Sequence, residues 1–294
     1  MRRYMLLAIL FFATACIRVE VNADENLSFD FKTKVRGEVT LDTTIKFEVD
    51  HPGKFSFELE NINGDIRAFR SPGREIKVVL MPSENAYERL KVYRYEDEDE
   101  AGIYVKSRKK YWKWKNFDEY RIDINVFLPE GIGKLEISTV NGDIHCFDDL
   151  VGGDIEISAV NGRIKGRIKG ESIDLSSVNG RINTHLSAED ISVSNVNGGL
   201  VVDLEKFNKT EISNVNGSIR VTVYRNHDFR GEISTVTGSI DIDDVEESPF
   251  LKHLEKSRSI VGKSYEFILG SGTSKLEVSN VNGSIRINLE GGTI

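Results

Sequence analysis

The sequence has no glutamine, only two cysteines and two tryptophans, and five histidines among its 294 residues. The histidines show no metal-site spacing and have no paired cysteine or second histidine nearby, which excludes the common zinc signatures. We therefore expect no metal and no cofactor. The absence of glutamine beside abundant lysine, arginine, glutamate and isoleucine is typical of a heat-adapted source.

A hydrophobic run long enough to span a bilayer is also missing. The chain begins with basic Arg2 and Arg3, and the apolar stretch that follows, Met5–Ala15, is too short to cross a membrane. We predict that residues 1–15 are an export signal. Its end, Ala13-Thr14-Ala15-Cys16, resembles the bacterial lipoprotein signal, which predicts lipid attachment at Cys16. Ordinary cleavage before Cys16 is the alternative.

The net charge is negative. It is −8 for the whole chain, and loss of Arg2 and Arg3 with the export signal would change it to −10. Such a surface argues against nucleic acid as a partner. A lipid on Cys16 would also leave Cys146 without a disulfide partner, so we expect Cys146 to be a small buried apolar residue.

A Val-Asn-Gly repeat dominates what is present. The regular copies have their asparagines at Asn141, Asn161, Asn179, Asn197 and Asn216, and Thr237 takes the same slot in the next copy. The steps from Asn141 to Thr237 are 20, 18, 18, 19 and 21 residues. An early Ile-Asn-Gly copy lies at Asn63, and a last copy lies at Asn282. A fixed period of this size indicates a stacked-repeat protein.

Apolar and polar residues alternate before each Asn-Gly, which predicts a half-buried strand. A hairpin turn at Asn141-Gly142 would place Val140 on the face away from Ile137 and Ile144. A corner there would let Val140 point inward with them, and we favour this path. It predicts two buried stacked columns, Ile144, Ile164, Ile182, Ile219 and Ile240 in one and Val140, Val160, Val178 and Val215 in the other. One observation opposes this path, because it would stack acidic side chains of like charge on one another. These residues are Glu136, Glu156, Asp174, Glu211, Glu232 and Glu277.

The predicted fold is all-β: a single elongated β-solenoid, β-helix-like, of about 18–21-residue coils with a more irregular N-terminal strand region. Four strand-like runs, Glu75–Leu80, Leu90–Tyr95, Ile103–Lys106 and Tyr120–Leu128, occupy that irregular region. Ser248-Pro249 before Phe250–Ser259 predicts a short helix. The predicted segments are residues 1–15 as export signal, 16–45 as leader and first strands, and 46–294 as solenoid, with an irregular section at 67–131, repeats at 132–243, an insertion with the short helix at 244–272 and a last repeat at 273–294.

No catalytic constellation stands out. His145 and Asp143 share a repeat, but the equivalent slots elsewhere hold residues typical of a solvated face. The acidic run Asp241–Asp244 could present carboxylates for acid–base chemistry or for a cation, but we favour an acidic loop that ends a strand. We therefore predict that the protein is not an enzyme.

The strongest binding candidate is the basic and aromatic segment Lys106–Lys115, which holds both tryptophans. If it is a strand, Trp112 and Trp114 share one face, and Lys113 and Lys115 share the other. Such a strand could hold a glycan, an anionic lipid or a protein. The alternative is that the tryptophans cover the end of the core and the lysines protect an exposed edge.

The early Leu59-Glu60-Asn61-Ile62-Asn63-Gly64-Asp65-Ile66, the strand ending in Val126–Gly131 and the serial Ser-x-Val-Asn-Gly-x-Ile copies together resemble the bacterial putative-adhesin family of β-strand-repeat domains. The resemblance covers residues 46–294. It implies an extracytoplasmic, often lipoprotein-like β-solenoid of unknown function.

We therefore predict a non-enzymatic cell-envelope scaffold or adhesin-like surface, anchored to the membrane by a lipid, that binds a protein or glycan partner. A soluble secreted or periplasmic form is the alternative location. A carbohydrate-active β-helix enzyme and an accessory or sensor protein of the envelope stress response are the alternative functions.

Overall fold

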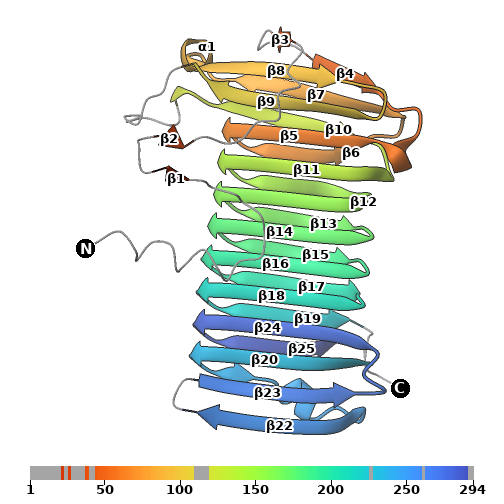
Figure 1. Cartoon of the computed structure of the whole chain (residues 1–294), viewed down its shortest axis with the longest axis vertical. Coiled ribbons are helices and arrows are strands. Elements are labelled where there is room, and N and C mark those ends of the chain that lie inside the picture. Colours follow the sequence, from red (N-terminus) through yellow and green to blue (C-terminus); the bar gives the residue numbers. More distant parts are fainter. Residues whose placement is uncertain are drawn as a thin grey trace.

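The computed structural model describes residues 21–22, 26–27, 37–39, 44–108, 119–224, 228–259 and 262–290. Within these ranges the fold is all-β, as predicted, and the three helices, Pro52–Lys54, α1 (Ala86–Arg89) and α2 (Asp243–Glu246), have at most four residues each. The strands stack along one long axis in two layers (Figure 1). In this part of the chain, no helix is long and apolar enough to cross a membrane.

Each Val-Asn-Gly copy contributes one strand before its corner and one after it. Strands before a corner form the front layer of Figure 1 and strands after it form the back layer, while the long β12 takes part in both. The strands of the regular repeats are β11 (Ile132–Asn141), β12 (Ile144–Asn161), β13 (Ile164–Lys169), β14 (Ser172–Asn179), β15 (Ile182–Ser187), β16 (Asp190–Asn197), β17 (Leu200–Lys206), β18 (Lys209–Asn216) and β19 (Ile219–Tyr224).

Equivalent strands of successive repeats pair in parallel. In the front layer Asn141 lies opposite Asn161, which in turn lies opposite Asn179, and the same register continues through β16 and β18. A hairpin meander would instead pair the two strands that flank each Asn-Gly antiparallel to each other. Like residues therefore stack repeat upon repeat.

The core lies between the two layers and contains the predicted isoleucine column. Ile144, Ile164 and Ile182 are fully buried, Ile219 is 1% exposed and Ile240 is 9% exposed. These residues begin the back-layer strands and lie directly opposite one another, with Leu200 and Ile285 in the same column. This prediction is confirmed.

The predicted burial of the valine column is wrong. Val140, Val160, Val178 and Val215 are only partly buried, and the equivalent Val236 and Val281 are 51% and 40% exposed. The alternation of the front strands continues through the valine up to the corner asparagine. Val140 therefore points outward with Glu136 and Ser138, and Thr139 takes the inner position.

The corners are held by two sets of side-chain amides. Inside, Asn195 and Asn214 are 3% exposed, and their Nδ2 atoms donate to the carbonyl oxygens of Gly180 (3.1 Å) and Gly198 (2.9 Å). Outside, the corner asparagines from Asn161 onward each donate to the corner asparagine of the neighbouring repeat, as Asn179 does to Asn161 at 2.9 Å. The turns also pack closely, because a Cβ on Gly180 would lie 1.8 Å from the oxygen of Gly162.

The N-terminal section ends the stack with antiparallel strands. The four predicted strand runs of this section are confirmed as β7, β8, β9 and β10, although Tyr120 and Arg121 lie before the last of these strands. β8 and β9 form an antiparallel hairpin, and the acidic residues 97–99 form the turn between them. The strands of this section are β3 (Gly37–Val39), β4 (Thr44–Glu48), β5 (Ser56–Asn63), β6 (Ile66–Arg70), β7 (Glu75–Pro82), β8 (Leu90–Glu96), β9 (Glu100–Ser107) and β10 (Ile122–Leu128). A separate two-strand ribbon joins β1 (Val21–Asn22) to β2 (Asn26–Leu27).

The C-terminal repeats leave sequence order. The last copy, β24 (Ser274–Asn282) and β25 (Ile285–Glu290), lies between β18/β19 and the earlier copy β20 (Phe229–Thr237)/β21 (Ile240–Asp241) (Figure 1). The hairpin of β22 (Leu251–Ser259) and β23 (Gly262–Leu269) follows β20 at that end of the stack.

The predicted helix at Phe250–Ser259 is wrong, because residues 251–259 form β22. Antiparallel pairing with β23 supplies backbone hydrogen bonds that outweigh the local helix start signal at Ser248-Pro249. The only helix in the described part of this insertion is the single turn α2.

Candidate functional site

The outer surface of the front layer is built from rows of equivalent residues. Because side chains alternate along a strand, the residues between the buried positions of β11, namely Glu136, Ser138 and Val140, all face outward. Parallel registers repeat this pattern on strand after strand. We call this surface the front face.

A carboxylate row runs across the front face at the strand spacing of about 4.8 Å. Ser192 is the one interruption, on β16. The row consists, in spatial order, of Glu58, Glu136, Glu156, Asp174, Glu211, Glu277, Glu232, Glu266 and Glu255. The stacking of like charges, which opposed the predicted fold, is therefore real. Burial raises the pKa of Asp174 to about 6, and the neighbouring carboxylate of Glu156 adds to the shift.

Hydroxyl groups form a second row beside the carboxylates. The serines of the two neighbouring strands β18 and β24, for example, lie directly opposite each other. The serine row is Ser138, Ser158, Ser176, Ser194, Ser213, Ser279, Ser234, Ser264 and Ser257. The partly exposed valines form the third row, next to the corner.

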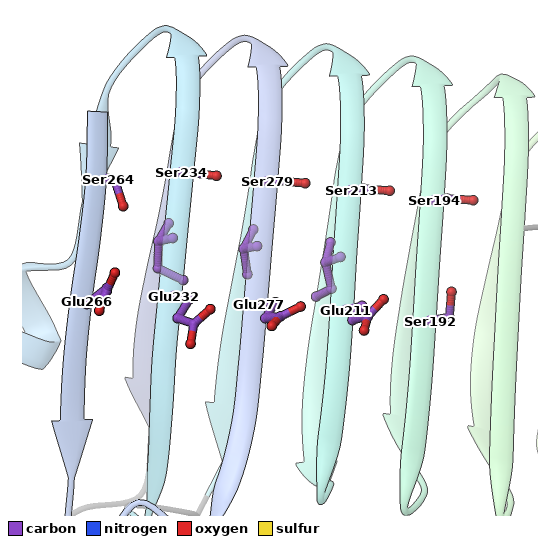
Figure 2. A pocket seen from close by; sticks show the side chains of 13 residues that line it. Ser192, Ser194, Glu211, Ser213, Glu232, Ser234, Ser264, Glu266, Glu277 and Ser279 are labelled. Carbon is purple, nitrogen blue, oxygen red and sulfur yellow. The ribbon is translucent and has the colours of Figure 1, made fainter. Parts of the chain in front are cut away.

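The carboxylate and serine rows line a shallow groove toward the C-terminal end of the stack. Its volume is about 390 Å³, and glutamates and serines from β18, β24, β20 and β23 face it (Figure 2). Lysines reach only part of its charge: Lys209 lies 2.8 Å from Glu211, and Lys275 contacts Glu277 and lies 3.4 Å from Glu232. The groove offers alternating acceptors and hydroxyls to a ligand.

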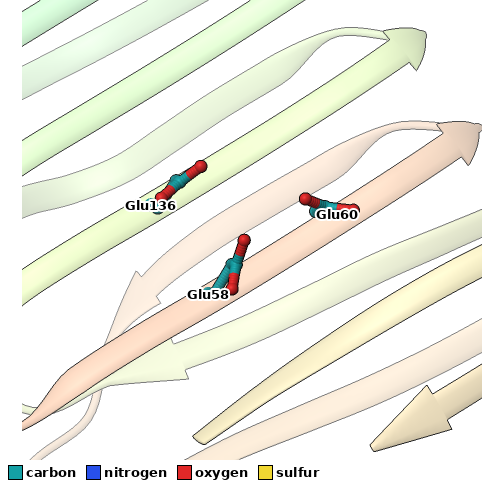
Figure 3. A group of neighbouring side chains, drawn as sticks. All are labelled: Glu58, Glu60 and Glu136. Carbon is teal, nitrogen blue, oxygen red and sulfur yellow. The ribbon is translucent and has the colours of Figure 1, made fainter. Parts of the chain in front are cut away.

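A tighter carboxylate cluster lies at the other end of the row. Carboxylate oxygens of Glu58, Glu60 and Glu136 lie within 4.8 Å of one another (Figure 3). The hydroxyl of Tyr104 donates to Glu58 Oε2 at 2.6 Å, and that of Tyr95 lies 3.3 Å from the same atom. Burial, then Glu58 and Glu136, raise the pKa of Glu60 to about 8. Glu60 therefore favours its protonated form at neutral pH.

Sequence reasoning missed this cluster. Glu58 and Glu136 lie opposite each other on β5 and β11, and Glu60 lies opposite Ser138. The available signal was that Glu60 replaces the serine of the other copies, which places two carboxylates on one side of one strand. Among the described residues, no histidine or cysteine belongs to such a cluster.

The outer surface of the back layer carries a stack of phenylalanines. The rings of Phe127 and Phe69 are 5.1 Å apart and those of Phe69 and Phe147 are 5.0 Å apart, between centroids. Lys77 covers one end of the stack and His145 the other. The register between β12 and β13 shifts between His145 and Asp149, a bulge in the 20-residue repeat that leaves Phe147 51% exposed.

Other reactive groups among the described residues are buried or engaged by neighbouring groups. Cys146 is buried, as predicted, and burial raises the pKa of its thiol to about 12. In the acidic run, Asp241 binds Arg286 at 2.7 Å, and Asp244 accepts from the Leu289 amide at 3.2 Å. These carboxylates thus hold the end of the stack together.

The predicted site residues lie outside the described residues. This applies to the lipid-attachment site, Cys16, and to the predicted partner-binding residues Trp112, Lys113, Trp114 and Lys115.

Sequence comparison finds neither a matching family model nor a matching curated protein. The chain is similar to several solved structures. A putative cell adhesion protein from Clostridium sporogenes is 12% identical, with a TM-score of 0.39 over 84% of this chain and 99% of the other. A putative adhesin from Bacteroides fragilis is 14% identical, with a TM-score of 0.40 over 83% and 96%. A putative lipid binding protein from Parabacteroides distasonis is 12% identical, with a TM-score of 0.38 over 85% and 96%.

The adhesin names agree with the family to which the sequence shows a resemblance. At this level of similarity the names describe those proteins alone.

Proposed function

We propose that this protein is a non-enzymatic component of the cell envelope, a β-solenoid of 18–21-residue coils whose front face is an adhesin-like surface for a glycan chain. Parallel pairing of equivalent strands one repeat apart and burial of the isoleucine column support the solenoid. The observation that carries the function is the set of carboxylate, serine and valine rows along the front face.

A surface that repeats at every strand is suited to a partner that is itself repetitive. Many weak contacts along a polymer then add up to strong binding without any deep pocket. Glycan hydroxyls can donate to the carboxylates and bond to the serines, while the apolar faces of sugar rings can cover the partly exposed valines. The shallow groove over β18, β24 and β20 is where these groups are most accessible.

Retention of the purified protein on immobilised chitin, cellulose and peptidoglycan tests this function. A Ser234→Lys/Ser279→Lys variant places two long charged side chains in the groove, at serines that are exposed. Ser284→Lys is the control, because Ser284 is an exposed serine at the corner and outside the groove. We expect retention of the wild type and the control and loss of the double variant. Equal retention of all three, or of none, would contradict the proposal.

The proposed location depends on lipid attachment at Cys16. Labelled fatty acid should be incorporated into the wild-type chain and be absent from Cys16→Ser, and only the wild type should sediment with membranes. Equal labelling of the two proteins would instead indicate ordinary cleavage and a soluble exported protein.

The cluster around Glu60 favours a second candidate, a carbohydrate-active enzyme. A carboxyl kept protonated close to a second acidic group is the arrangement that glycosidases use to cleave sugar chains. Glu60, whose pKa is raised to about 8, lies within 4.8 Å of Glu58. The same polysaccharides provide the test. Release of reducing ends that is lost in Glu60→Gln would establish the enzyme, and we expect no release.

A further inference from the structure

A second hollow lies on the other side of the Asn-Gly corner from the front face. Its volume is about 810 Å³, and it is lined by the first exposed residues of the back-layer strands β6, β12, β13 and β15 together with the corner itself. We call it the corner groove. Its charged side chains are Asp65, Arg67, Asp143, Arg163, Lys165 and Arg181, with His145 among them. Cations therefore outnumber carboxylates, in contrast to the front face.

The carboxylates of the corner groove are already engaged by neighbouring groups. Asp143 accepts two hydrogen bonds from the Arg163 guanidinium, at 2.9 and 2.7 Å, and one from the Arg163 amide at 2.8 Å. Asp65 accepts from the Asp143 amide at 3.0 Å and pairs with Arg67 at 3.2 Å. These acids tie successive repeats together and are not available to neutralise other cations.

Two cations of the corner groove remain without such a partner. Lys165 and Arg181 are exposed, and no described carboxylate lies within ion-pair distance of either. Asn183, also exposed, lies directly opposite Lys165 on the next strand. Lys165 and Asn183 lie about one strand spacing, roughly 4.8 Å, apart, and Arg181 precedes Asn183 by two residues. The three side chains thus present two positive charges and one amide on neighbouring repeats.

A glycine keeps the groove open beside Arg181. Gly199 occupies the slot that holds Asp143, Arg163, Arg181 and Ser218 in other copies. The fold does not require glycine there, because an added Cβ would meet nothing closer than 3.6 Å, with Arg181 Nε at 3.8 Å. The preceding Gly198 is different, since its Cβ would lie 1.8 Å from the oxygen of Gly180. A side chain at 199 would stand next to the Arg181 guanidinium, so its absence leaves that cation accessible.

The electrostatic environment agrees with an anion site. Burial lowers the pKa of His145, and the positive charges of Lys165 and Arg67 lower it further. The carboxylate of Asp143 raises this pKa, but its effect is weaker. His145 lies between these two cations in register, opposite Arg67 on β6 and opposite Lys165 on β13. Around His145, the positive charges of the groove thus outweigh the negative charges of its acids.

We propose that the corner groove binds a carboxylate-bearing sugar of an acidic glycan, with Lys165 and Arg181 contacting the carboxylate and Asn183 a hydroxyl. An arginine fork and a lysine are the usual partners of such an anion. The isoleucines beneath the groove, Ile144 and Ile164, are fully buried, so a lipid chain would find no apolar surface there. The net charge of −8 disfavours a densely charged nucleic acid, whereas a glycan carries its charges farther apart.

Calorimetric titration of the full chain with short oligogalacturonate tests this site. Lys165→Ala and Arg181→Ala should each weaken binding about tenfold, the effect expected when one charged hydrogen bond is lost. Gly199→Glu should abolish binding, because its carboxylate can pair with Arg181. Arg220→Ala is the matched control, because Arg220 is exposed on the back layer, forms no ion pair with a described residue and lies outside the groove. It should bind as the wild type does.

Two further ligands define the chemistry. The methyl ester of the same oligosaccharide should not bind, and inorganic phosphate should bind far more weakly than the oligosaccharide. Equal binding of the ester would show that the carboxylate is not recognised, and equal binding of phosphate would show a general anion site; either result overturns the proposal. So would unchanged affinity in Lys165→Ala, Arg181→Ala and Gly199→Glu. The front-face proposal is tested separately, because Ser234→Lys/Ser279→Lys leaves this groove unaltered.

Discussion

The isoleucine column and the valine row both consist of β-branched aliphatic residues that recur with the Val-Asn-Gly repeat. The isoleucines nevertheless face the core, whereas the valines face outward. Ile164 is fully buried, whereas Val160, four residues earlier, is only partly buried, and its equivalent Val236 is 51% exposed. The difference arises at the corner. The front strand keeps its alternation until Asn161, so Val160 faces outward and Ala159 inward, and the chain then turns and brings Ile164 to the inside.

This comparison teaches that hydrophobicity alone does not identify the inner side of a repeat. The inner position before the corner is often polar, as in Asn195 and Asn214, because the side-chain amide there donates to a carbonyl oxygen of the previous turn. The outer position can be apolar, because the stacked valines cover part of one another's surface.

The largest expected effect is on the inner column. Ile164→Asp should lower the free energy of unfolding by about 4 kcal/mol or more, because a carboxylate would enter a packed apolar core. Val160→Asp, in the same copy, should change it by less than about 1 kcal/mol, since this side chain is partly exposed. Chemical denaturation measures both. Equal losses in the two variants would mean that the valine row is part of the core after all.

Much of the fold could be predicted because the repeat signals its own strands. The period, the apolar–polar alternation and the isoleucine two residues after each glycine predicted strands that stack like on like, and the registers confirm this. The side on which the valine lies could not be derived in the same way. It depends on whether the chain turns before or after the valine, and a short alternating pattern fits both paths.

The spatial order of the last repeats could not be predicted from their order in the sequence. The copy at Asn282 lies between those at Asn216 and Thr237, although Thr237 comes earlier in the chain. The corner amides offer a reason: Asn282 donates to Asn216 at 2.9 Å and continues the asparagine ladder. A threonine has no amide to extend it, so the copy with Thr237 lies beyond the end of the ladder. The threonine at position 237 is visible in the sequence, but its effect on repeat order can be interpreted only once the asparagine ladder is known.

The second largest effect should separate two glycines that differ only in what surrounds them. Gly180→Ala should destabilise the protein by about 1–3 kcal/mol, because its Cβ would overlap the oxygen of Gly162 at 1.8 Å. Gly199→Ala should be close to neutral, because its Cβ meets nothing within 3.6 Å. Thermal and chemical unfolding of the pair provide the measurement. A large loss in Gly199→Ala would show that the fold, rather than the corner groove, requires glycine there.

The third prediction compares an inner with an outer asparagine. Asn214→Ala removes a buried donor from the Gly198 oxygen and should cost about 1–2 kcal/mol. Asn216→Ala removes bonds to Asn197 and from Asn282, but its amide is exposed to water that can replace them, and the cost should be about 0.5 kcal/mol. The midpoint of urea unfolding distinguishes the two. If Asn216→Ala is the more harmful change, the outer ladder contributes more than its exposure suggests.

The candidate sites were less predictable than the fold because they arise from rows, and a row exists only when registers are known. The slot shared by Glu136 and Glu211 was visible in the alignment of copies, but Glu255 and Glu266 join it from the antiparallel hairpin, which has no Val-Asn-Gly motif. Lys165 and Arg181 likewise became candidates only when the structure showed that the nearby acids, Asp65 and Asp143, are bonded to other groups. The binding role of Trp112 and Trp114 stays a prediction.

The smallest expected effect concerns Glu60, an outward-facing residue that is nevertheless mostly buried. Its pKa is raised from 4.5 to about 8, so the folded state holds a proton that the unfolded state releases above pH 4.5. The stability associated with this proton is complete below pH 4.5 and is lost as the pH rises through about 8.

Glu60→Gln keeps a neutral side chain at every pH and should therefore unfold at the same midpoint as the wild type in acid. As the pH rises to about 8, the variant should become the more stable of the two. Screening by solvent at this partly exposed cluster should keep the difference to about 1 kcal/mol. Thermal melts of both proteins across this window measure it, and Glu119→Gln, which changes an exposed glutamate outside the cluster, is the control. A difference that stays constant with pH would mean that the folded protein does not hold the proton on Glu60.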